Sequence, residues 1–414
     1  MTLDEVGVDV EIATQGVGLA PVFQPIVSLP DAVVVGFEAL ARWPSSGGLD
    51  PCAVFAHARA TERTDQLDRM CIDAAIASAL ASGWAPNTLL SLNCEPTAVS
   101  IRRSEDEVLA RGYEELQLLF ELTERSLLEH PHALLHKVAA LRRDGFAIAL
   151  DDVGVNPDSL ALLDVISPDV VKLDLTLVQS QPDDAQARTL TAVMAHHERT
   201  GALILAEGIE CDDHLEQALA LGADLGQGAM FGLPRPAAEH PPPAAWSLPP
   251  RKRRPAAAGA SPFDIISGRR PVRTARKETM TALSRHIESQ ARRAADPPIL
   301  LAALQHAENF TGHTRGSYRS LATHSPLVAV FGRELRADPG SAVRAVDLDP
   351  TDQLCAEWVV LVLGPHTAAA LIGREHDADP RSDCRDGDRR FDFVITYDRA
   401  LVTAAACNML DRMR

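Results

Sequence analysis

The chain has 414 residues, of which 46% are hydrophobic and 23% are charged, a composition typical of a soluble globular protein with room for two domains. No apolar run reaches the roughly 18 residues that a membrane helix needs. The acidic N-terminal segment lacks the basic and apolar regions of a signal peptide. Seven scattered cysteines without a CxxC pair indicate reduced thiols, so we expect a cytoplasmic protein with no membrane partner.

Charge is unevenly distributed along the chain. Residues 1–240 hold 37 acidic and 15 basic residues, a net charge of −22, whereas the remaining residues hold 20 and 25, a net charge of +5. An acidic surface repels polyanions. This argues against a nuclease and against a nucleic acid polymer as partner, although the same charge can also serve solubility alone.

Short apolar segments, most of them separated by helical patterns, follow one another through the first 230 residues. This alternation predicts a parallel sheet, and the number of repeats suits a βα barrel. One connection is typical: residues 131–150 place Pro131 at a helix start, apolar residues at helical spacing, and Gly145 at the helix end before the strand FAIALDD.

A polar residue follows each of these apolar segments, and in a βα barrel the C-terminal strand ends carry the chemistry. In chain order these residues are Glu38, Asn93, Glu121 with Glu124, Asp151 with Asp152, Lys172 with Asp174, Glu207 with Glu210, and Gln227. Any one of them alone is commonly a cap, a turn residue or a salt-bridge partner. The ordered set, however, predicts a rim of carboxylates, which requires divalent cations because like charges at contact distance repel.

The residue types suggest how such a rim is used. Asp151 and Asp152 are adjacent, and one bridging carboxylate with a neighbour is a common way to hold two metal ions about 3.5–4 Å apart. Glu38, Asn93 and Glu121 are the further residues that complete an all-oxygen shell suited to magnesium or manganese. Lys172 is then available to hold an attacking water or a phosphate oxygen, and Glu207 to bind the second ion or to accept a proton.

The histidines point away from a metal site. His132 and His136 have i,i+4 spacing, but Ala133 stands where a zinc HExxH motif has glutamate. We expect both on the surface of an amphipathic helix, and the pair His196–His197 facing solvent on another.

A Pro- and Ala-rich segment with a basic cluster, Arg251–Arg254, separates this region from a second pattern. We interpret the segment as a solvated linker. A helical stretch over 277–294 leads into PILLAALQHAENF, and five short strand patterns and a final helix over 400–413 follow. They predict a compact α/β or α+β domain of about 150 residues.

The first region resembles the EAL family of cyclic-di-GMP phosphodiesterases. The resemblance covers about residues 18–236 and rests on motifs in family order: FQPI, GFEALARW around Glu38, SLNCEP, FELTE, ALDDVG, PDVVKLD, AEGIE and GADLGQGAMFGLPRP. It implies a modified TIM barrel that uses two Mg²⁺ or Mn²⁺ ions to hydrolyse cyclic-di-GMP to linear pGpG. A catalytically inactive cyclic-di-GMP receptor is the alternative, but such receptors usually lose a metal ligand, and here every ligand position matches.

The resemblance also implies roles for residues. Glu38, Asn93, Glu121 and Asp151 match ligands of the first metal, and Asp151, Asp152 and Glu207 match those of the second. Lys172 matches the residue that orients the nucleophilic water, Gln227 and Glu124 match supporting positions, and Gln24 and Arg42 match positions that contact the dinucleotide.

The chain departs from the family pattern just after the two aspartates. The segment Val153–Asp158 replaces the usual FGTGYS, and Ala229 replaces the usual Tyr. Because the family associates this loop with dimerisation, a homodimer is expected but its activation by dimer contacts is in doubt.

The last region resembles the DICT family of sensory domains, through FDIISGR, AVDLDP, EWVVLVLGPH and RRFDFVITYDRALV. A ligand or protein partner of this domain, of unknown identity, would regulate the barrel. We therefore predict an N-terminal extension over 1–17, a barrel over 18–236, a linker over 237–260 and a sensory domain over 261–414.

Overall fold

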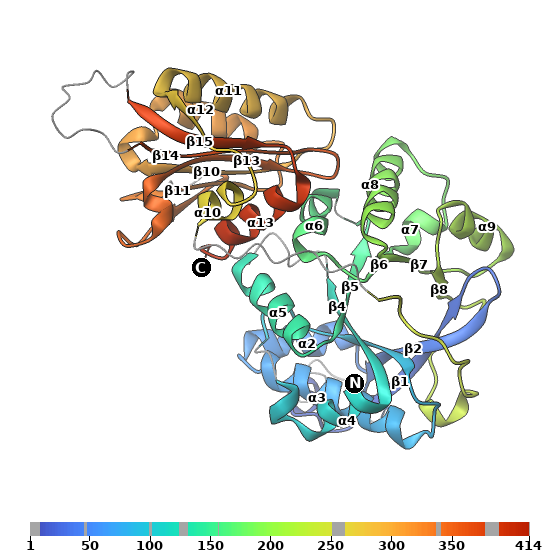
Figure 1. Cartoon of the computed structure of the whole chain (residues 1–414). Coiled ribbons are helices and arrows are strands. Elements are labelled where there is room, and N and C mark those ends of the chain that lie inside the picture. The colour runs from blue at the N-terminus through green and yellow to red at the C-terminus, as the bar shows by residue number, and fades with distance from the viewer. Residues whose placement is uncertain are drawn as a thin grey trace. The chain divides into compact units, whose positions relative to one another are not determined.

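The structure is a computed structural model of the whole chain (Figure 1). It describes residues 9–44, 48–98, 102–123, 131–155, 157–250, 261–336, 341–376 and 389–413. The chain divides into two compact units. The first consists of Met1–Ser126, His136–Pro157 and Pro168–Lys252, and the second of Leu127–Leu135, Asp158–Ser167 and Arg253–Arg414.

The N-terminal unit contains a closed eight-stranded barrel, which confirms the predicted fold. Strands β2 to β8 are parallel to one another, whereas β1 runs antiparallel to both of its neighbours, β2 and β8. This antiparallel strand is where the barrel departs from a regular alternation, because the short turn between β1 and β2 leaves no room for a crossover helix. The strands are β1 (Ala20–Ser28), β2 (Val33–Arg42), β3 (Thr88–Asn93), β4 (Leu116–Thr123), β5 (Ala147–Val153), β6 (Val170–Leu173), β7 (Leu203–Ala206) and β8 (Leu225–Gly226).

Helices connect the parallel strands. They are α2 (Pro51–Ala60), α3 (Thr64–Ala81), α4 (Glu107–Glu115), α5 (Pro131–Arg143), α6 (Leu163–Ile166), α7 (Leu175–Val178), α8 (Asp184–Thr200) and α9 (Asp212–Ala220). As predicted, Pro131 begins α5, and Gly145 follows that helix in the left-handed region, with φ of 88°. The expected strand GQGAMFG is shorter than its sequence pattern, because β8 ends at Gly226 and Gln227 begins the turn after it.

One end of the barrel interior is filled by apolar side chains from all eight strands, and a segment that follows the barrel in the sequence covers it. Leu89, Leu119 and Ala149 belong to this buried cluster, and Trp246 and Leu248 pack against it. The Gln117 side chain fixes the covering segment, because its Nε2 donates to the carbonyl oxygen of Trp246 at 2.8 Å and its Oε1 accepts from the amide of Leu248 at 2.8 Å. Part of the segment expected to be a linker is therefore held on the barrel.

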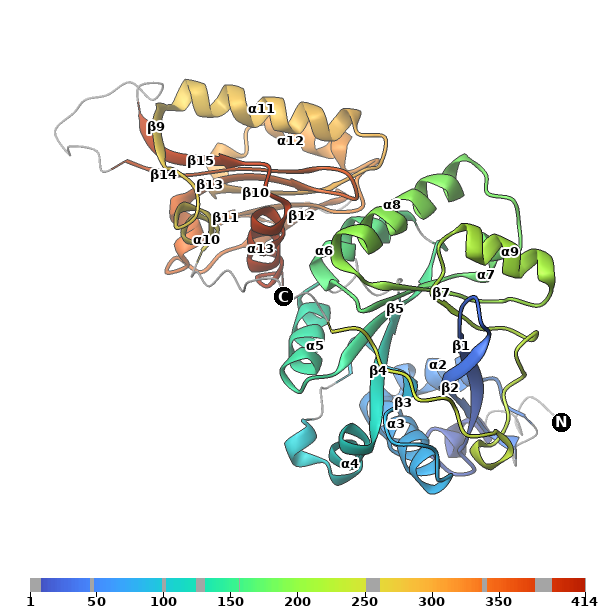
Figure 2. The same ribbon diagram turned by 45° about the vertical axis from the view of Figure 1, so that its right-hand side comes forward.

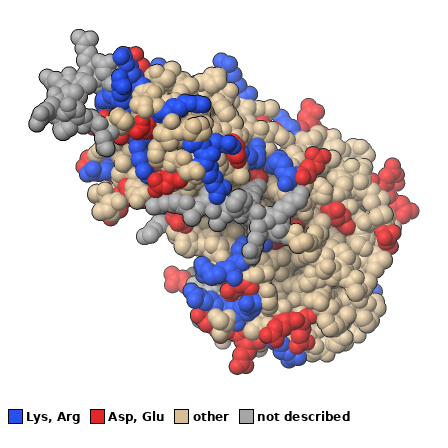
Figure 3. All heavy atoms as spheres, in the orientation of Figure 1, with Lys and Arg blue, Asp and Glu red and all other residues tan. Residues whose placement is uncertain are grey.

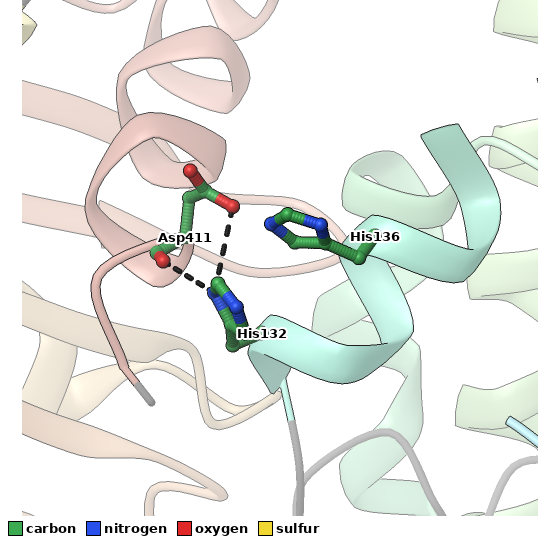
Figure 4. A group of neighbouring side chains, drawn as sticks. All are labelled: His132, His136 and Asp411. Atoms are coloured by element: carbon green, nitrogen blue, oxygen red, sulfur yellow. Dashed lines mark hydrogen bonds and ion pairs between the residues drawn. The ribbon is translucent and has the colours of Figure 1, made fainter. Parts of the chain in front are cut away.

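The histidines agree with the sequence analysis in one helix and not in the other. His132 and His136 project from the same face of α5, half-buried and exposed respectively (Figure 4). The expectation that His196 faces solvent is wrong, because its side chain is fully buried in α8. His197 is half-buried, and its Nδ1 donates to the carbonyl oxygen of Ala202 at 2.8 Å.

The C-terminal unit is built on a seven-stranded sheet with the order β12-β11-β10-β13-β14-β15-β9. Its first three strands are parallel and the others antiparallel. The strands are β9 (Arg273–Arg276), β10 (Ile299–His306), β11 (Val328–Arg333), β12 (Val343–Asp347), β13 (Glu357–Leu363), β14 (Ala368–Glu375) and β15 (Arg390–Thr396). The five predicted strand patterns are confirmed, and the segment PILLAALQHAENF supplies a central strand, β10.

Helices cover both faces of this sheet (Figure 2). One face carries α11 (Lys277–Arg293) and α12 (Gly312–Leu321), and the other carries α10 (Pro262–Ser267) and α13 (Arg399–Leu410). Met280, Ile287 and Tyr318 from the first pair of helices enter a buried cluster with the sheet. The predicted helix over 277–294 is therefore confirmed, and its apolar stripe explains why it packs on the sheet.

Lys and Arg side chains gather over the C-terminal unit on the face drawn in Figure 3, which agrees with its positive share of the sequence charge. Among the described residues, no helix is both long enough and apolar enough to cross a lipid bilayer.

Candidate active site

The predicted rim residues converge at the C-terminal ends of the barrel strands. Glu38 lies in β2, Asn93 ends β3, Glu121 lies in β4 and Asp151 in β5, while Lys172 lies in β6. Glu207 and Gln227 directly follow β7 and β8. The parallel register explains the convergence, because it places Asn93 beside Glu121 in neighbouring strands.

Lys172 is at the centre of this cluster. Its side chain is 1% exposed, and its Nζ lies 2.8 Å from Glu121 Oε2, 2.9 Å from Asp151 Oδ1 and 2.8 Å from Glu207 Oε1. A fourth carboxylate oxygen, Glu38 Oε2, lies 3.7 Å away. One ammonium therefore faces four carboxylates, and the cluster retains an excess of negative charge.

Glu38 connects the lysine cluster to two amides. Its Oε1 accepts from Asn93 Nδ2 at 3.1 Å, and its Oε2 accepts from Gln227 Nε2 at 2.7 Å. These two bonds hold one carboxylate in a fixed orientation and leave the amide oxygens facing elsewhere. The Gln227 Oε1 is buried and has no hydrogen-bond partner among the described residues. This site therefore offers a buried oxygen that can still accept a hydrogen bond.

Asp151 and Asp152 reach the same site although they are adjacent in the chain. In a regular strand their side chains would point to opposite faces. The backbone of Asp152 instead adopts the left-handed region with φ of 58°, and the pairing of β5 with β6 shifts register there. As a result, carboxylate oxygens of Asp151, Asp152 and Glu207 all lie within 4.8 Å of one another.

The pKa shifts reflect this crowding. Burial, and then the neighbouring Glu38, raise the pKa of Glu121 well above its usual value, against the opposing effect of Lys172. Burial also raises the pKa of Glu207 to about 8, again against Lys172. Burial lowers the pKa of Lys172, but the surrounding carboxylates outweigh that effect, so this pKa is well above the ordinary lysine value.

The donor set fits divalent cations. It consists of carboxylate and amide oxygens, which Mg²⁺ and Mn²⁺ prefer, and four carboxylates lie around a single ammonium, so the positive charge of a cation would compensate the remainder. The three oxygens of Asp151, Asp152 and Glu207 provide one group of ligands at short separation.

Two predicted substrate contacts lie beside this cluster. Gln24 is the register partner of Glu38 across the antiparallel pair of β1 and β2, so both residues face the same side. Arg42 lies four residues beyond Glu38 in β2, and it lines a cavity of about 320 Å³ together with Asn93. Among the described residues of the cluster, Asn93 is the one that lines this cavity, whose acidic lining residues are Asp68 and Glu95.

Three outcomes complete the comparison with the predicted set. Glu124 lies outside the described residues. Asp174 caps α7 by accepting from the amide of Thr176 at 2.9 Å, and Glu210 is exposed, so neither joins the cluster.

Ser91 is a residue that the sequence analysis missed. It is fully buried in β3, and its hydroxyl donates to Glu121 Oε1 at 2.5 Å. With Lys172 on Oε2, this bond fixes both oxygens of Glu121. Ser91 lies two residues before Asn93, so strand alternation places both side chains on the same face, and this spacing could have identified it from the sequence.

Comparison with known proteins identifies two families. Residues 8–234 match the EAL domain family, and residues 267–376 match the DICT family, described as a sensory domain in diguanylate cyclases and two-component systems. The structural prediction of both domains from sequence is thus confirmed.

Several curated proteins are similar to the N-terminal part. Cyclic di-GMP phosphodiesterase RocR of Pseudomonas aeruginosa is 28% identical over 223 residues, which are 52% of this chain and 57% of that protein. Probable cyclic di-GMP phosphodiesterase PdeG of Escherichia coli is 29% identical over 227 residues, 52% of this chain and 44% of that protein. The match therefore spans less than two thirds of the length of each relative.

Two solved structures are among those that align with part of this chain. One titled "PaMucR Phosphodiesterase, c-di-GMP complex" superposes with a TM-score of 0.47 at 24% identity, over 56% of this chain and 98% of that chain. Another, a manganese and cyclic-di-GMP complex of BlrP1 from Klebsiella pneumoniae, has a TM-score of 0.45 at 26% identity, over 53% of this chain and 56% of that chain.

Proposed function

The chain belongs to the EAL domain family, and on that premise we propose that it is a metal-dependent phosphodiesterase that hydrolyses cyclic-di-GMP to linear pGpG. The observation that carries the proposal is the cluster in which Glu121, Asp151 and Glu207 each contact Lys172 at 2.8–2.9 Å. The similarity to the cyclic di-GMP phosphodiesterase RocR and the probable cyclic di-GMP phosphodiesterase PdeG supports the same reaction.

We assign the cluster to two divalent cations, Mg²⁺ or Mn²⁺. Glu38, Asn93, Glu121 and Asp151 would hold one, and Asp151, Asp152 and Glu207 the other. Bound divalent cations polarise a phosphoryl oxygen and lower the pKa of a coordinated water. Ser91 and Gln227 support this assignment, because their hydrogen bonds fix the carboxylates of Glu121 and Glu38.

Lys172 has a second role in this proposal besides charge balance. Its ammonium carries three donors, and its contacts with Glu121, Asp151 and Glu207 hold it at the point where the two proposed ligand groups meet. When cations compensate the carboxylates, these donors become available to a water molecule, which Lys172 then orients toward the scissile phosphate.

The cavity beside the cluster supports a nucleotide as substrate. Arg42 lines it, and a guanidinium suits a phosphate because its planar donors can bind two oxygens at once. Gln24, opposite Glu38 on the neighbouring strand, adds an amide that can hydrogen-bond to the same ligand. In the full protein the C-terminal DICT domain would modulate this activity.

One observation favours the alternative function, a receptor that binds cyclic-di-GMP without cleaving it. The segment Val153–Asp158 differs from the family pattern directly after the two aspartates. A receptor would retain binding in the 320 Å³ cavity and lose the geometry of the cations.

The test is incubation of the purified full chain with cyclic-di-GMP and Mg²⁺ or Mn²⁺, followed by chromatography of the products. We expect pGpG, and we expect EDTA to stop its formation reversibly. Glu207→Gln should abolish turnover, whereas the matched control Glu210→Gln, an exposed glutamate three residues further on, should leave it unchanged.

Calorimetric titration with the dinucleotide separates the two functions. Binding without any pGpG from the wild type, at every metal concentration, would establish the receptor instead. Equal turnover of Glu207→Gln and the wild type would refute the proposed ligand set.

A further inference from the structure

The C-terminal unit contains a cavity that the phosphodiesterase reaction does not use. It has a volume of about 250 Å³ and lies between α11, α12 and the sheet. Its apolar side is formed by Leu304 of β10, Trp358 and Val360 of β13, and Phe391 of β15. The rings of Trp358 and Phe391 stand perpendicular to each other, with centroids 5.5 Å apart, so one wall of the cavity is aromatic and offers a ring edge and a ring face to a ligand.

Buried polar groups line the opposite side of this cavity. The Tyr318 hydroxyl, fully buried, donates to Glu288 Oε1 at 2.8 Å. Ser284 also lines the cavity and is 4% exposed, and its Oγ has no hydrogen-bond partner among the described residues. A buried hydroxyl without a partner is unfavourable, and a ligand that accepts a hydrogen bond there would remove that cost.

Basic side chains also line the cavity. Lys277, Arg285 and Arg389 line it. Arg389 is already held by Glu375, to which its Nε and Nη2 donate at 2.7 and 2.6 Å. Arg285 is exposed and makes no ion pair within the part of the chain that the structure describes, so its guanidinium is available to an anion. It follows Ser284 in the sequence, which puts an unused hydroxyl and an unused cation at neighbouring positions of α11.

These features define the ligand by its chemistry. A volume of about 250 Å³ lies just below the roughly 300–1,000 Å³ of drug-sized pockets, which favours a small ligand. The aromatic wall favours a flat ring, and the guanidinium of Arg285, which forms no ion pair among the described residues, favours an anion.

We propose that this cavity binds a small single-ring aromatic carboxylate. Its ring packs against Trp358 and Phe391, its carboxylate pairs with Arg285, and Ser284 donates a hydrogen bond to one carboxylate oxygen. The C-terminal unit thereby has a ligand site that is formed by its own residues and not by those of the barrel.

The test uses calorimetric titration of the full chain with three probes of similar size: benzoate, its neutral counterpart benzamide, and the cation benzylamine. We expect saturable binding of one benzoate, at least about tenfold tighter than benzamide, because the charge-assisted bonds require the carboxylate. Benzylamine should bind more weakly still, since three basic residues line the cavity.

Variants identify the site. Arg285→Gln should weaken benzoate about tenfold and leave benzamide nearly unchanged. The matched control Arg293→Gln removes another exposed arginine of the same helix that does not line the cavity, and should have no effect. Ser284→Leu should fill the cavity and abolish binding of both benzoate and benzamide.

The proposal is overturned if benzoate and benzamide bind equally, if benzylamine binds best, or if no probe binds at about 10 mM. It is also overturned if Arg285→Gln and Arg293→Gln reduce benzoate binding to the same extent. Arg285 is exposed, so its replacement leaves the core intact and decides the question even if Ser284→Leu does not fold.

Discussion

Replacing Lys172 by methionine removes an ammonium that contacts three carboxylates and lies close to a fourth. Without metal ions, the loss of one partner from a buried charged group costs about 3–5 kcal/mol. The pKa of Glu207, already raised to about 8, limits this cost because that carboxyl is largely protonated at neutral pH. For a unit of this size each kcal/mol lowers Tm by about 2–4 °C, so we expect Tm in EDTA to fall by roughly 6–20 °C.

Divalent cations should reverse much of this loss, because they supply the positive charge that the variant lacks. The measurement is thermal unfolding of the full chain, followed by circular dichroism, in EDTA and in saturating Mn²⁺. Turnover of cyclic-di-GMP in Mn²⁺ should nevertheless fall by on the order of 10²–10³, since the donor that orients the water is gone. Restored stability without restored turnover is the expected pattern.

Lys137→Met is the matched control. This lysine is also buried, with its Nζ 4.0 Å from Asp68 and 3.1 Å from the carbonyl oxygen of Ala98, outside the carboxylate cluster. It should lose similar stability in EDTA and in Mn²⁺. The reasoning is refuted if the two variants respond alike to metal, or if Lys172→Met keeps wild-type turnover.

Three further predictions concern the barrel unit. Gly228→Ala would place a Cβ 2.1 Å from the carbonyl oxygen of Ile209, so we expect a lower Tm in calorimetry. Turnover should also fall, because the adjacent glutamine supports the site. An unchanged Tm would contradict the close approach. Burial raises the pKa of Asp68 from 3.8 to about 6, so the stabilisation by the neutral form is fully present only below the unfolded pKa and is lost as the pH rises through 6. Relative to Asp68→Asn, the free energy of unfolding of the wild type should fall by about 2 kcal/mol between pH 4 and pH 7. A constant difference in urea titrations would exclude the shift. A fragment of residues 1–250 should fold and keep the chemistry. Its free energy of unfolding in urea should exceed that of a fragment of residues 1–240 by about 1–3 kcal/mol, because the shorter fragment lacks the segment that packs on the barrel. Equal stability would show that this packing contributes nothing.

The sequence predicted that the rim residues converge, because the alternation of strands and helices dictates where strand ends meet. Once Glu38, Asn93 and Glu121 were each placed at the end of a strand, the closed parallel barrel required them to share one rim. The ligand roles of these residues and the boundaries of the domains stay predictions, since they depend on cations and a substrate that periodicity cannot reveal.

Other features depend on contacts between segments far apart in the chain, which no local pattern encodes. Ser91 is an ordinary strand residue until Glu121 on the neighbouring strand gives its hydroxyl a partner. The packing of Trp246 under the barrel was hidden because its neighbours are prolines, which resemble a linker in composition. The burial of His196 depends on which face of α8 meets the barrel, and a polar pair in mid-helix suggested the wrong face.

The left-handed backbone of Asp152 has a consequence for how variants of this chain should be selected and interpreted. Glycine and asparagine adopt that conformation more readily than aspartate, so at this position the residue best for folding differs from the residue that supplies a carboxylate. A library screened only for heat resistance should therefore accumulate glycine or asparagine at 152 and lose acidity beside Glu207. Conversely, in a relative whose activity has not been measured, glycine at the corresponding position would indicate a barrel in which that residue serves folding and no longer supplies a catalytic carboxylate.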